Sequence, residues 1–322
     1  MTRSALITGG AGFIGSHVAD RLLAAGWRVA AFDNFAIGRR ENVAHLESHP
    51  AFTLIDGDIA DRAALARIVT DADVDTIFHL AAVHYIPFCT ANPYEAMRIN
   101  VLGTQAVIDA AAAGSTRTIV FASTSDVYAI KDSPLVETDP VDPYTVYGTT
   151  KMTSERLLHL ATTMNPRLTV AIARLFNVYG PRETNPHVLP DILEQLRAGG
   201  RTLQLGNLWP RRDFVFVDDV ADAFVALVGS PERFDAFNVG TGVALSIGDA
   251  VAAIADLLRR PLEVVADPER ARPVERNCLH ANIDKIGRVL GWRPRHSFAG
   301  GMARWLVADH VMDEVSPARR NV

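Results

Sequence analysis

The stretch Thr8-Gly9-Gly10-Ala11-Gly12-Phe13-Ile14-Gly15-Ser16-His17 decides the fold of this chain. The apolar residues 5–7 precede it, and a helical pattern of apolar residues begins at Val18. In the order strand, glycine turn and helix, glycines allow a tight turn, close approach of the backbone to a pyrophosphate, and close packing of helix on strand. The N–H groups at the start of the helix then face the phosphates. We therefore expect a dinucleotide cradle here.

A second strand strengthens this interpretation. Glycine patterns are weak signals alone, and two of them overlap here, G-x-G-x-x-G from Gly10 and G-x-x-G-x-x-G from Gly9. The strand expected at 28–32 ends at Asp33, close to the offset of about 20 residues at which an acid binds an adenosine ribose. The alternative is a flexible glycine turn without a nucleotide, and the context favours the nucleotide.

Strands and helices alternate through the first half of the chain. Short apolar runs predict buried strands, and the intervening segments predict helices; the strands are at 53–58, 76–82, 117–123 and 169–174, and the helices at 61–69, 92–113 and 143–163. This alternation predicts an α/β fold with a Rossmann-type, doubly wound parallel sheet. Ligands bind at the carboxyl ends of such strands, where we expect residues 33–35, 81–89 and 123–128.

The pattern changes after Asn177, where Gly-Pro and Asn-Pro pairs interrupt it. We expect a smaller C-terminal substrate-binding lobe, with a helix at 246–258 capped by Ser246. A strand at 214–217 and a helix at 218–228 are assigned to the large sheet. The cofactor domain then covers residues 1–177 with about 214–239, and the lobe covers 178–213 and 240–322.

Composition excludes several classes of protein. The chain has 322 residues, 48% of them hydrophobic, so it is globular rather than disordered. A net charge of −5 argues against a nucleic-acid partner. Cys89 and Cys278 form no C-x-x-C pair, which argues against a metal site and suits the cytoplasm. No leader and no apolar run long enough for a membrane span is expected.

Tyr147 and Lys151 are the strongest catalytic candidates. They lie four residues apart on an expected helix and therefore share one face. A nearby ammonium and a positive nicotinamide ring both favour the phenolate, which lowers the tyrosine pKa from about 10. A Tyr–Lys pair on a helix surface is the alternative. The upstream nucleotide site and the Ser-Thr-Ser-Asp run at 123–126 favour the catalytic interpretation.

Six ordered motifs carry a family resemblance: TGGAGFIGSH at 8–17, HLAA at 79–82, STSDVY at 123–128, YGTTK at 147–151, RLFNVYGP at 174–181 and RRDFVFVDD at 211–219. With these the chain resembles the extended short-chain dehydrogenase/reductases, and within them the nucleotide-sugar epimerases and dehydratases. The resemblance runs from residue 4 to about 295.

The resemblance implies NAD as cofactor. The implied cofactor-binding residues are Gly9, Gly12, Phe13, Ile14, Gly15, Asp33, Asn34, Asp58, Ile59, Leu80, Ala81, Ala82, His84, Tyr147 and Lys151. Asp33 and Asn34 would hold the adenosine ribose and favour NAD over NADP, because a 2′-phosphate would meet a carboxylate. Lys151 would bind the nicotinamide ribose, and His84 falls where a ribose contact is usual.

The resemblance also implies a nucleotide-diphosphate sugar as substrate and a homodimer formed through the helices at 92–113 and 144–163. Tyr147 would be the acid/base, and Thr124 would hydrogen-bond the reacting hydroxyl. Asn177, Arg212 and Arg272 would bind the diphosphate. The expected substrate contacts also include Ser125 and Asp126. We further expect Trp209 and residues 185–189 to line the pocket.

Departures from the family pattern bear on the reaction. Cys89 replaces a serine, and Ala129 replaces a glycine. Asp126 stands where dehydratases and uronate decarboxylases usually carry glutamate, so it could act as a second base at carbon 5. Capping or a solvent-facing position is its alternative. Ser125 and Val83 stand where dehydratases commonly carry acids, which argues against dehydration.

We therefore expect a UDP-hexose or UDP-uronate 4-epimerase. Tyr147, helped by Thr124, would deprotonate the 4-hydroxyl while hydride moves to tightly held NAD, and the 4-keto sugar would turn and take the hydride on its other face. The alternative is a dehydratase or decarboxylase that uses Asp126 after the same oxidation. A non-catalytic NAD-binding regulator is a third possibility, against which the intact set of Thr124, Tyr147 and Lys151 argues.

Overall fold

A computed structural model of the chain describes residues 3–270 and 276–312. Seven parallel strands form the large sheet in the order β10-β6-β5-β4-β1-β2-β3. Their bounds are β1 Ser4–Thr8, β2 Arg28–Asp33, β3 Phe52–Asp56, β4 Thr76–His79, β5 Thr118–Thr124, β6 Thr169–Leu175 and β10 Phe234–Val239. The order runs outward in both directions from β1, which confirms the doubly wound topology. The switch point, where ligands bind in such sheets, lies between β1 and β4.

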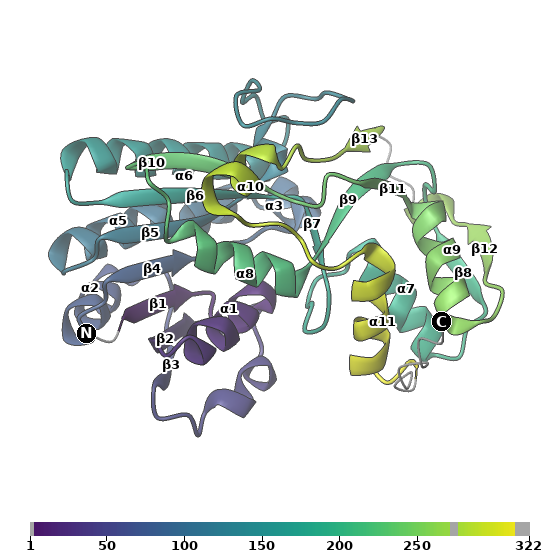
Figure 1. Cartoon of the computed structure of the whole chain (residues 1–322), viewed down its shortest axis with the longest axis horizontal. Helices are drawn as coiled ribbons and strands as arrows, with labels where there is room; N and C mark the ends of the chain where they lie inside the picture. Colours follow the sequence, from purple (N-terminus) through teal and green to yellow (C-terminus); the bar gives the residue numbers. More distant parts are fainter. Residues whose placement is uncertain (1–2, 271–275, 313–322) are drawn as a thin grey trace.

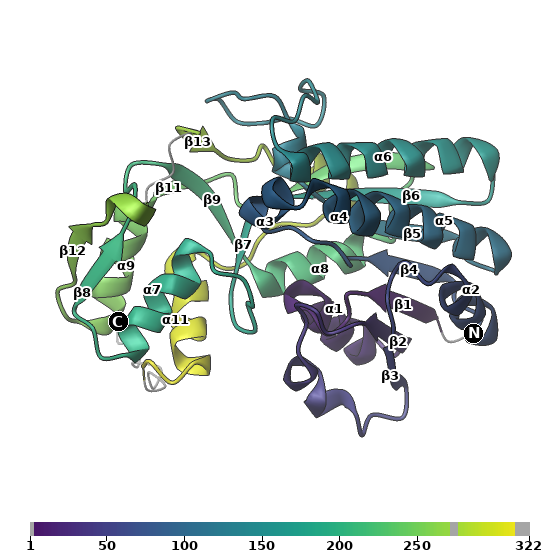
Figure 2. The same ribbon diagram turned by 180° about the vertical axis from the view of Figure 1, so that it is seen from behind.

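Helices cover both faces of this sheet (Figure 1; Figure 2). One face carries α1 (Phe13–Ala24) and α8 (Val217–Leu227), which pack on each other. The other carries α2 (Arg62–Asp71), α5 (Gly103–Ala113) and α6 (Val146–Met164). Side chains of successive strand residues point to opposite faces of a sheet. In β1, Ile7 packs in the core with α1 and α8, whereas Leu6 packs in the core with α2, α5 and α6.

Local side-chain chemistry sets the ends of several helices. Asp61 accepts a hydrogen bond from the Ala64 N–H and so caps α2. Thr145 accepts from the Gly148 N–H, so α6 begins at Val146 and not at the expected residue 143. The expected helix at 92–113 is α4 (Pro93–Met97), a π-helical segment at 98–102, and α5. A short helix that the sequence did not predict, α3 (Ile86–Ala91), follows β4.

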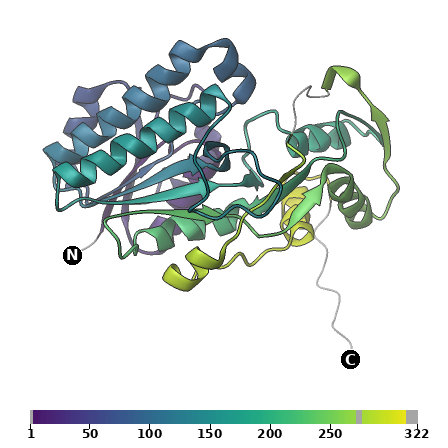
Figure 3. The same ribbon diagram turned by 90° about the horizontal axis from the view of Figure 1, so that it is seen from above.

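A smaller lobe lies at one end of the large sheet (Figure 3). It contains a four-stranded sheet made of β7 (Asn177–Tyr179), β9 (Arg211–Phe216), β11 (Ala244–Ser246) and β13 (Cys278–Leu279), and the pair β8 (Thr202–Leu205) and β12 (Glu263–Ala266). Its helices are α7 (Val188–Arg197), α9 (Ile247–Leu258) and α11 (Phe298–Ala308), which share an apolar core. The Ser246 side chain caps α9 as expected.

One sequence-based assignment to the large sheet is wrong. The strand expected at 214–217 is β9, and it pairs with β7, β11 and β13 of the smaller lobe. The helix that follows it, α8, packs on α1 against the large sheet, and β10 joins that sheet beside β6. The chain therefore crosses between the two parts where β9 ends at Phe216 and α8 begins at Val217. α10 (Asp284–Leu290) returns to pack on β10.

Within residues 3–270 and 276–312, every helix is too short or too polar to cross a bilayer.

Candidate active site

The glycine turn between β1 and α1 is closely packed. Gly9 has a φ of +72°, a conformation that glycine adopts readily and other residues rarely do. A Cβ on Gly15 would lie 2.1 Å from the Gly9 carbonyl oxygen, so no side chain fits there. Helix α1 follows Gly12, which has no side chain to cap it, and the first-turn N–H groups are available to an anion. This cradle fits the pyrophosphate of a dinucleotide.

Asp33, at the carboxyl end of β2, is buried against the same turn. Its two oxygens accept hydrogen bonds from the N–H groups of Ala11 and Phe35, each at 2.9 Å. Burial raises the pKa of Asp33, and these N–H groups lower it. Each carboxylate oxygen has a second lone pair, so the side chain can still accept from a ribose hydroxyl. Neighbouring Asn34 donates to Asp58 at 3.4 Å.

A cavity of about 350 Å³ runs along the carboxyl ends of the strands. All of the expected cofactor residues line it: Gly9, Gly12, Phe13, Ile14, Gly15, Asp33, Asn34, Asp58, Ile59, Leu80, Ala81, Ala82, His84, Tyr147 and Lys151. So do five of the six expected substrate residues, Thr124, Ser125, Asp126, Asn177 and Arg212. The sixth, Arg272, lies outside the described residues. The fold thus gathers these residues, while their individual roles stay predictions.

Tyr147 and Lys151 project from the first two turns of α6 toward the end of β5. Lys151 Nζ donates to the Ala122 carbonyl oxygen at 2.8 Å and lies 4.7 Å from the centre of the Phe121 ring. Its distance to the Tyr147 ring centre is 6.0 Å. Thr124, the last residue of β5, hydrogen-bonds Tyr147. The phenol and the hydroxyl thus lie together in the lining of the cavity.

The protonation of this pair differs from the expectation. Burial raises the pKa of Tyr147, the Asp126 charge adds to the increase, and the Thr124 hydrogen bond opposes it. Burial lowers the pKa of Lys151 to about 7, and the Glu155 carboxylate raises it. The expected lowering of the Tyr147 pKa is therefore not found in the protein alone, because desolvation of the phenolate is the largest influence on that pKa. The positive nicotinamide ring, the other half of that expectation, belongs to the bound cofactor.

A buried ion pair between Glu155 and Arg174 lies next to Lys151 on α6. Glu155, one turn further along α6, accepts from Arg174 Nη2 on β6 at 2.7 Å and from Ser123 Oγ on β5 at 2.5 Å. Both charged side chains are 8% exposed. The Arg174 guanidinium also stacks on the Tyr128 ring at 4.7 Å. These contacts connect α6, β5 and β6, and so hold the helix that carries Tyr147 and Lys151.

Asp126 sits in a 3-10 turn at 125–127 directly after β5. Its backbone N–H donates to Thr124 Oγ1 at 3.1 Å, and its charge acts on the Tyr147 pKa. Ser125 is buried and also lines the cavity. Both residues thus line the cavity, where substrate contacts were expected, and the role of the half-buried Asp126 stays a prediction.

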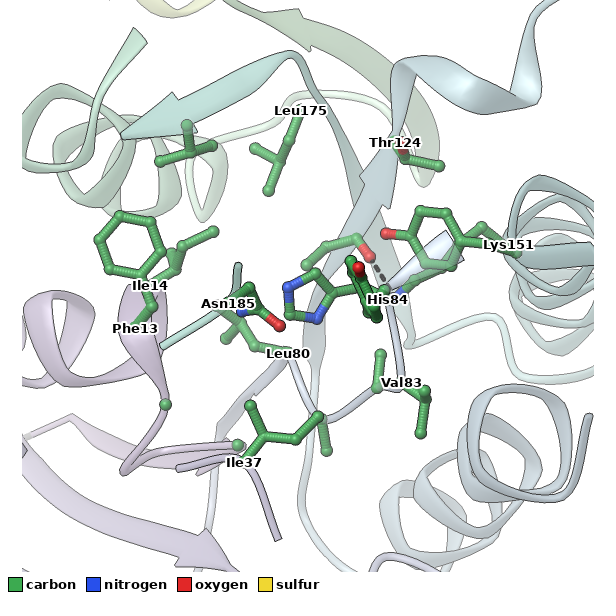
Figure 4. Close-up of a pocket in the computed structure, with 18 of the residues that line it drawn as sticks. Phe13, Ile14, Ile37, Leu80, Val83, His84, Thr124, Lys151, Leu175 and Asn185 are labelled. Atoms are coloured by element: carbon green, nitrogen blue, oxygen red, sulfur yellow. Dashed lines mark hydrogen bonds between the residues drawn. The ribbon is translucent and has the colours of Figure 1, made fainter. Parts of the chain in front are cut away.

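Three histidine and glutamate side chains form a part of the cavity that the sequence did not predict as a unit. Figure 4 shows His84 beside Asn185, between Phe13 and Ile14 on one side and Thr124 and Lys151 on the other. The His84 and His187 rings are 6.1 Å apart, and His187 Nδ1 lies 2.6 Å from Glu183 Oε1.

Burial is the main influence on the charges of this group. It lowers the pKa of His84 to about 3, and the charges of His187 and Lys151 act in the same direction. Burial raises the pKa of Glu183, and the hydrogen bond to His187 lowers it. A neutral imidazole at His84 therefore faces the pocket.

Other lining residues were also missed. Glu183, Tyr144 and Arg276 line the cavity, although no local motif marks them. Asn185 and His187 lie in the stretch expected to line it. Trp209, expected beside them, is 52% exposed on the smaller lobe. Such residues come from loops whose position depends on the packing of the lobe, and spacing in the sequence carries no information about that.

The sequence matches the NAD dependent epimerase/dehydratase family over residues 5–240. The chain belongs to this family. A UDP-glucose 4-epimerase from Mycolicibacterium smegmatis is 36% identical over 305 residues, which cover 93% of this chain and 96% of that protein. The predicted family, the Rossmann-type fold and the NAD dependence are confirmed.

Two solved structures share the fold. The UDP-glucuronic acid 4-epimerase from Bacillus cereus, in complex with UDP-glucuronic acid and NAD, has a TM-score of 0.87 at 26% identity, covering 95% of this chain and 99% of that one. A dTDP-glucose 4,6-dehydratase from Streptomyces venezuelae has a TM-score of 0.83 at 30% identity, covering 94% and 95%. Epimerases and dehydratases thus share this architecture.

Proposed function

We propose that this chain is an NAD-dependent nucleotide-sugar 4-epimerase. The observation that carries the proposal is the convergence of Thr124, Tyr147 and Lys151 on one wall of a cavity whose other end is the glycine cradle. A regulator that only binds NAD needs the cradle but has no use for these three side chains. The relatives named epimerases support the proposal.

The residues of the chain divide the chemistry between them. When bound, NAD supplies the ring that oxidises carbon 4 of the sugar and reduces it again. Tyr147 takes the proton from the 4-hydroxyl and later returns one to it, and Thr124 holds that oxygen in place. The Lys151 ammonium, held by the Ala122 carbonyl, binds the nicotinamide ribose and favours the phenolate of Tyr147. Rotation of the 4-keto sugar between the two steps inverts carbon 4.

The second candidate is a dehydratase or uronate decarboxylase in which Asp126 acts as a base after oxidation. The place of Asp126 beside Tyr147 favours it. Two other residues in the cavity favour the epimerase: Ser125 and Val83 are not acidic, so nothing at those positions protonates a leaving hydroxyl. We therefore retain the epimerase as the first proposal.

One experiment separates these reactions. Purified holoenzyme is incubated with UDP-glucose, UDP-N-acetylglucosamine, UDP-glucuronate and dTDP-glucose, and the products are followed by mass spectrometry and sugar NMR. An unchanged mass with inverted carbon 4 supports the epimerase, and loss of water or carbon dioxide refutes it. In the same assay Asp126→Asn removes the activity of a dehydratase, whereas an epimerase keeps most of its rate.

We assign cofactor binding to the large sheet with its helices, and nucleotide-sugar binding to the smaller lobe at 178–213 and 240–322. In this assignment Asn177, Arg212 and Arg272 bind the diphosphate. The Asn177 side-chain oxygen is buried and has no hydrogen-bond partner among the described residues, as in a site that awaits a ligand. Titration with UDP alone tests the assignment, since Arg212→Met should weaken UDP binding by roughly tenfold or more.

We also propose that the protein is a cytoplasmic homodimer. Large apolar side chains are exposed along α4 to α6, with Tyr94 82%, Leu102 61% and Met164 84% exposed. A second copy packed on these helices would bury these apolar side chains. The proposed compartment rests on the cysteines: Cys89 and Cys278 are free thiols, which suits a reducing environment. Light scattering after size-exclusion chromatography gives the oligomeric state, and Leu102→Asp should produce a monomer.

A further inference from the structure

Arg276 is a buried cation with unused hydrogen-bond donors. Its side chain lines the cavity, and the residue is 4% exposed. A guanidinium has five N–H groups. Nη2 donates to the Tyr128 carbonyl oxygen at 3.0 Å, but Nε and Nη1 are buried and have no hydrogen-bond partner among the described residues.

The guanidinium is held in one orientation on the catalytic side of the cavity. Its central carbon lies 4.6 Å from the centre of the Tyr144 ring, so the planar group rests on that face. Tyr144 is three residues before Tyr147, and Tyr128 is two residues after Asp126. The two anchors therefore belong to the segments that carry the acid/base residues, at the place where the sugar must lie.

Such an arrangement is costly without a partner. Buried donors left unsatisfied each cost about 1–3 kcal/mol, and more when they carry charge. Buried arginines accordingly pair with anions, and the fork of parallel N–H groups matches the two oxygens of a carboxylate. One hydrogen of Nη2 is used by Tyr128. The other Nη2 hydrogen lies parallel to a hydrogen of either Nε or Nη1, so one two-pronged fork is still free to bind a carboxylate.

We infer that Arg276 binds the carboxylate of a sugar acid, so that this chain prefers nucleotide-diphosphate hexuronates to neutral hexoses. The inference rests on the proposed nucleotide-sugar site and names the class of sugar within it. The diphosphate is assigned to Asn177 and Arg212 at the smaller lobe, whereas Arg276 points its side chain to Tyr128 and Tyr144. Carbon 6 carries the one group that distinguishes a hexuronate from the corresponding hexose, and Arg276 supplies the matching charge.

The test compares binding of UDP-glucuronate and UDP-glucose to NAD-loaded protein by calorimetry, in a Tyr147→Phe background that prevents turnover. UDP-glucuronate should bind at least tenfold more tightly. Arg276→Met should bring the ratio of the two dissociation constants close to one, a loss of at least tenfold in preference, as expected for loss of one partner of a buried charge pair. Arg276→Lys keeps the charge but loses the fork, and should fall between the two.

Arg211→Met is the matched control, since this arginine donates to the Ala244 carbonyl from a half-exposed side chain on the adjoining strand β9. It should leave both dissociation constants as they are. Equal binding of the two sugars in the Tyr147→Phe background overturns the inference. So does an Arg276→Met variant that weakens UDP, UDP-glucose and UDP-glucuronate alike, because that result places the guanidinium at the diphosphate.

Folding of the Arg276 variants is checked by NAD content and by thermal unfolding. If Arg276→Met does not fold, the sugar preference of the parent protein and of Arg276→Lys decides the question. Turnover is measured separately in the unmodified enzyme. Absence of turnover with selective binding of UDP-glucuronate refutes the epimerase proposal and leaves the role of Arg276 standing, so the two failures are distinguishable.

Discussion

Replacing Glu155 with glutamine perturbs the buried Glu155–Arg174 charge pair, which lies one helical turn from Lys151. The Glu155 carboxylate accepts from Ser123 Oγ at 2.5 Å, from Arg174 Nε at 3.1 Å and from Arg174 Nη2 at 2.7 Å. Glutamine keeps the shape but loses the charge, and its amide NH₂ cannot accept from the group it then faces. Arg174 becomes a buried cation without its carboxylate.

The cost follows from this geometry. Removal of one partner from a buried ion pair destabilises a protein by roughly 3–5 kcal/mol. Each kcal/mol lowers Tm by about 2–4 °C in domains of 150–250 residues and by less in a longer chain, so we expect a fall of roughly 5–10 °C. Calorimetric unfolding of the NAD-loaded variant beside the unmodified protein measures the change.

The same substitution shifts the pH dependence of activity. Burial lowers the pKa of Lys151 to about 7, and the Glu155 carboxylate raises it. Without that carboxylate the Lys151 pKa falls further. Because the mechanism uses the ammonium, the alkaline decline of kcat/KM should move to lower pH in Glu155→Gln. A profile of kcat/KM against pH between 5 and 10 shows the shift.

Glu155→Met combined with Arg174→Met is the control. No unpaired charge is left in this double variant, so it should recover much of the lost stability. Since the Glu155 carboxylate is absent from it too, its alkaline decline should still differ from that of the unmodified enzyme. The reasoning is refuted if Glu155→Gln unfolds at the same temperature as the unmodified protein, or if its alkaline decline does not move.

Three further predictions concern the cofactor end of the site and Lys151. Gly15→Ala should abolish NAD retention and lower stability by about 2 kcal/mol or more, because its Cβ would lie 2.1 Å from the Gly9 carbonyl oxygen; cofactor content and Tm report this. Lys151→Met should remove a rise of stability with pH between about 7 and 10. Over that range the unfolded chain keeps a proton that the buried lysine, with its pKa lowered from 10.5 to about 7, has lost, which is worth up to ~1.4 kcal/mol per pH unit; urea unfolding at pH 7 and 9 measures the slope. Asp33→Asn should weaken NAD retention and let NADP compete. The Asp33 carboxylate accepts from the Ala11 and Phe35 N–H groups at 2.9 Å, and asparagine loses one of these hydrogen bonds together with the charge that repels a 2′-phosphate. Dialysis against each cofactor, followed by analysis of the bound nucleotide, tests this prediction.

Each of these predictions has its own check. Gly248→Ala is the matched control for Gly15→Ala. A Cβ on Gly248 would lie 3.7 Å from its nearest neighbouring atom, an ordinary contact, so the Gly248→Ala variant should retain NAD. If Gly15→Ala retains NAD, the proposal that the glycine turn binds the pyrophosphate is wrong. A slope in Lys151→Met equal to that of the unmodified protein shows that other groups cause it. If Asp33→Asn still does not bind NADP, residues other than Asp33 cause the selectivity for NAD over NADP.

Local patterns in the sequence predicted much of the site. Tyr147 and Lys151 share a face because they are four residues apart on one helix, and Asp33 meets the glycine turn because parallel strands end at one edge of the sheet. Helix caps at Asp61 and Ser246 are also local. The assignment of β9 failed, because an apolar strand fits either sheet and only its neighbours decide between them.

By itself, the sequence determined the glycine cradle, the family, the doubly wound sheet and the placing of Tyr147 and Lys151 on one helix. The cradle and the Tyr147–Lys151 pair rest on residues within one element or one strand–turn–helix unit, where spacing dictates geometry. The family and the sheet rest on the order of such units along the chain. The tertiary structure alone decided which distant side chains share the cavity, the desolvation that raises the Tyr147 pKa and lowers that of Lys151, and the placing of Arg276 against Tyr128 and Tyr144. Burial and contacts between loops depend on how the smaller lobe packs against the large sheet, and that packing has no local signature in the chain.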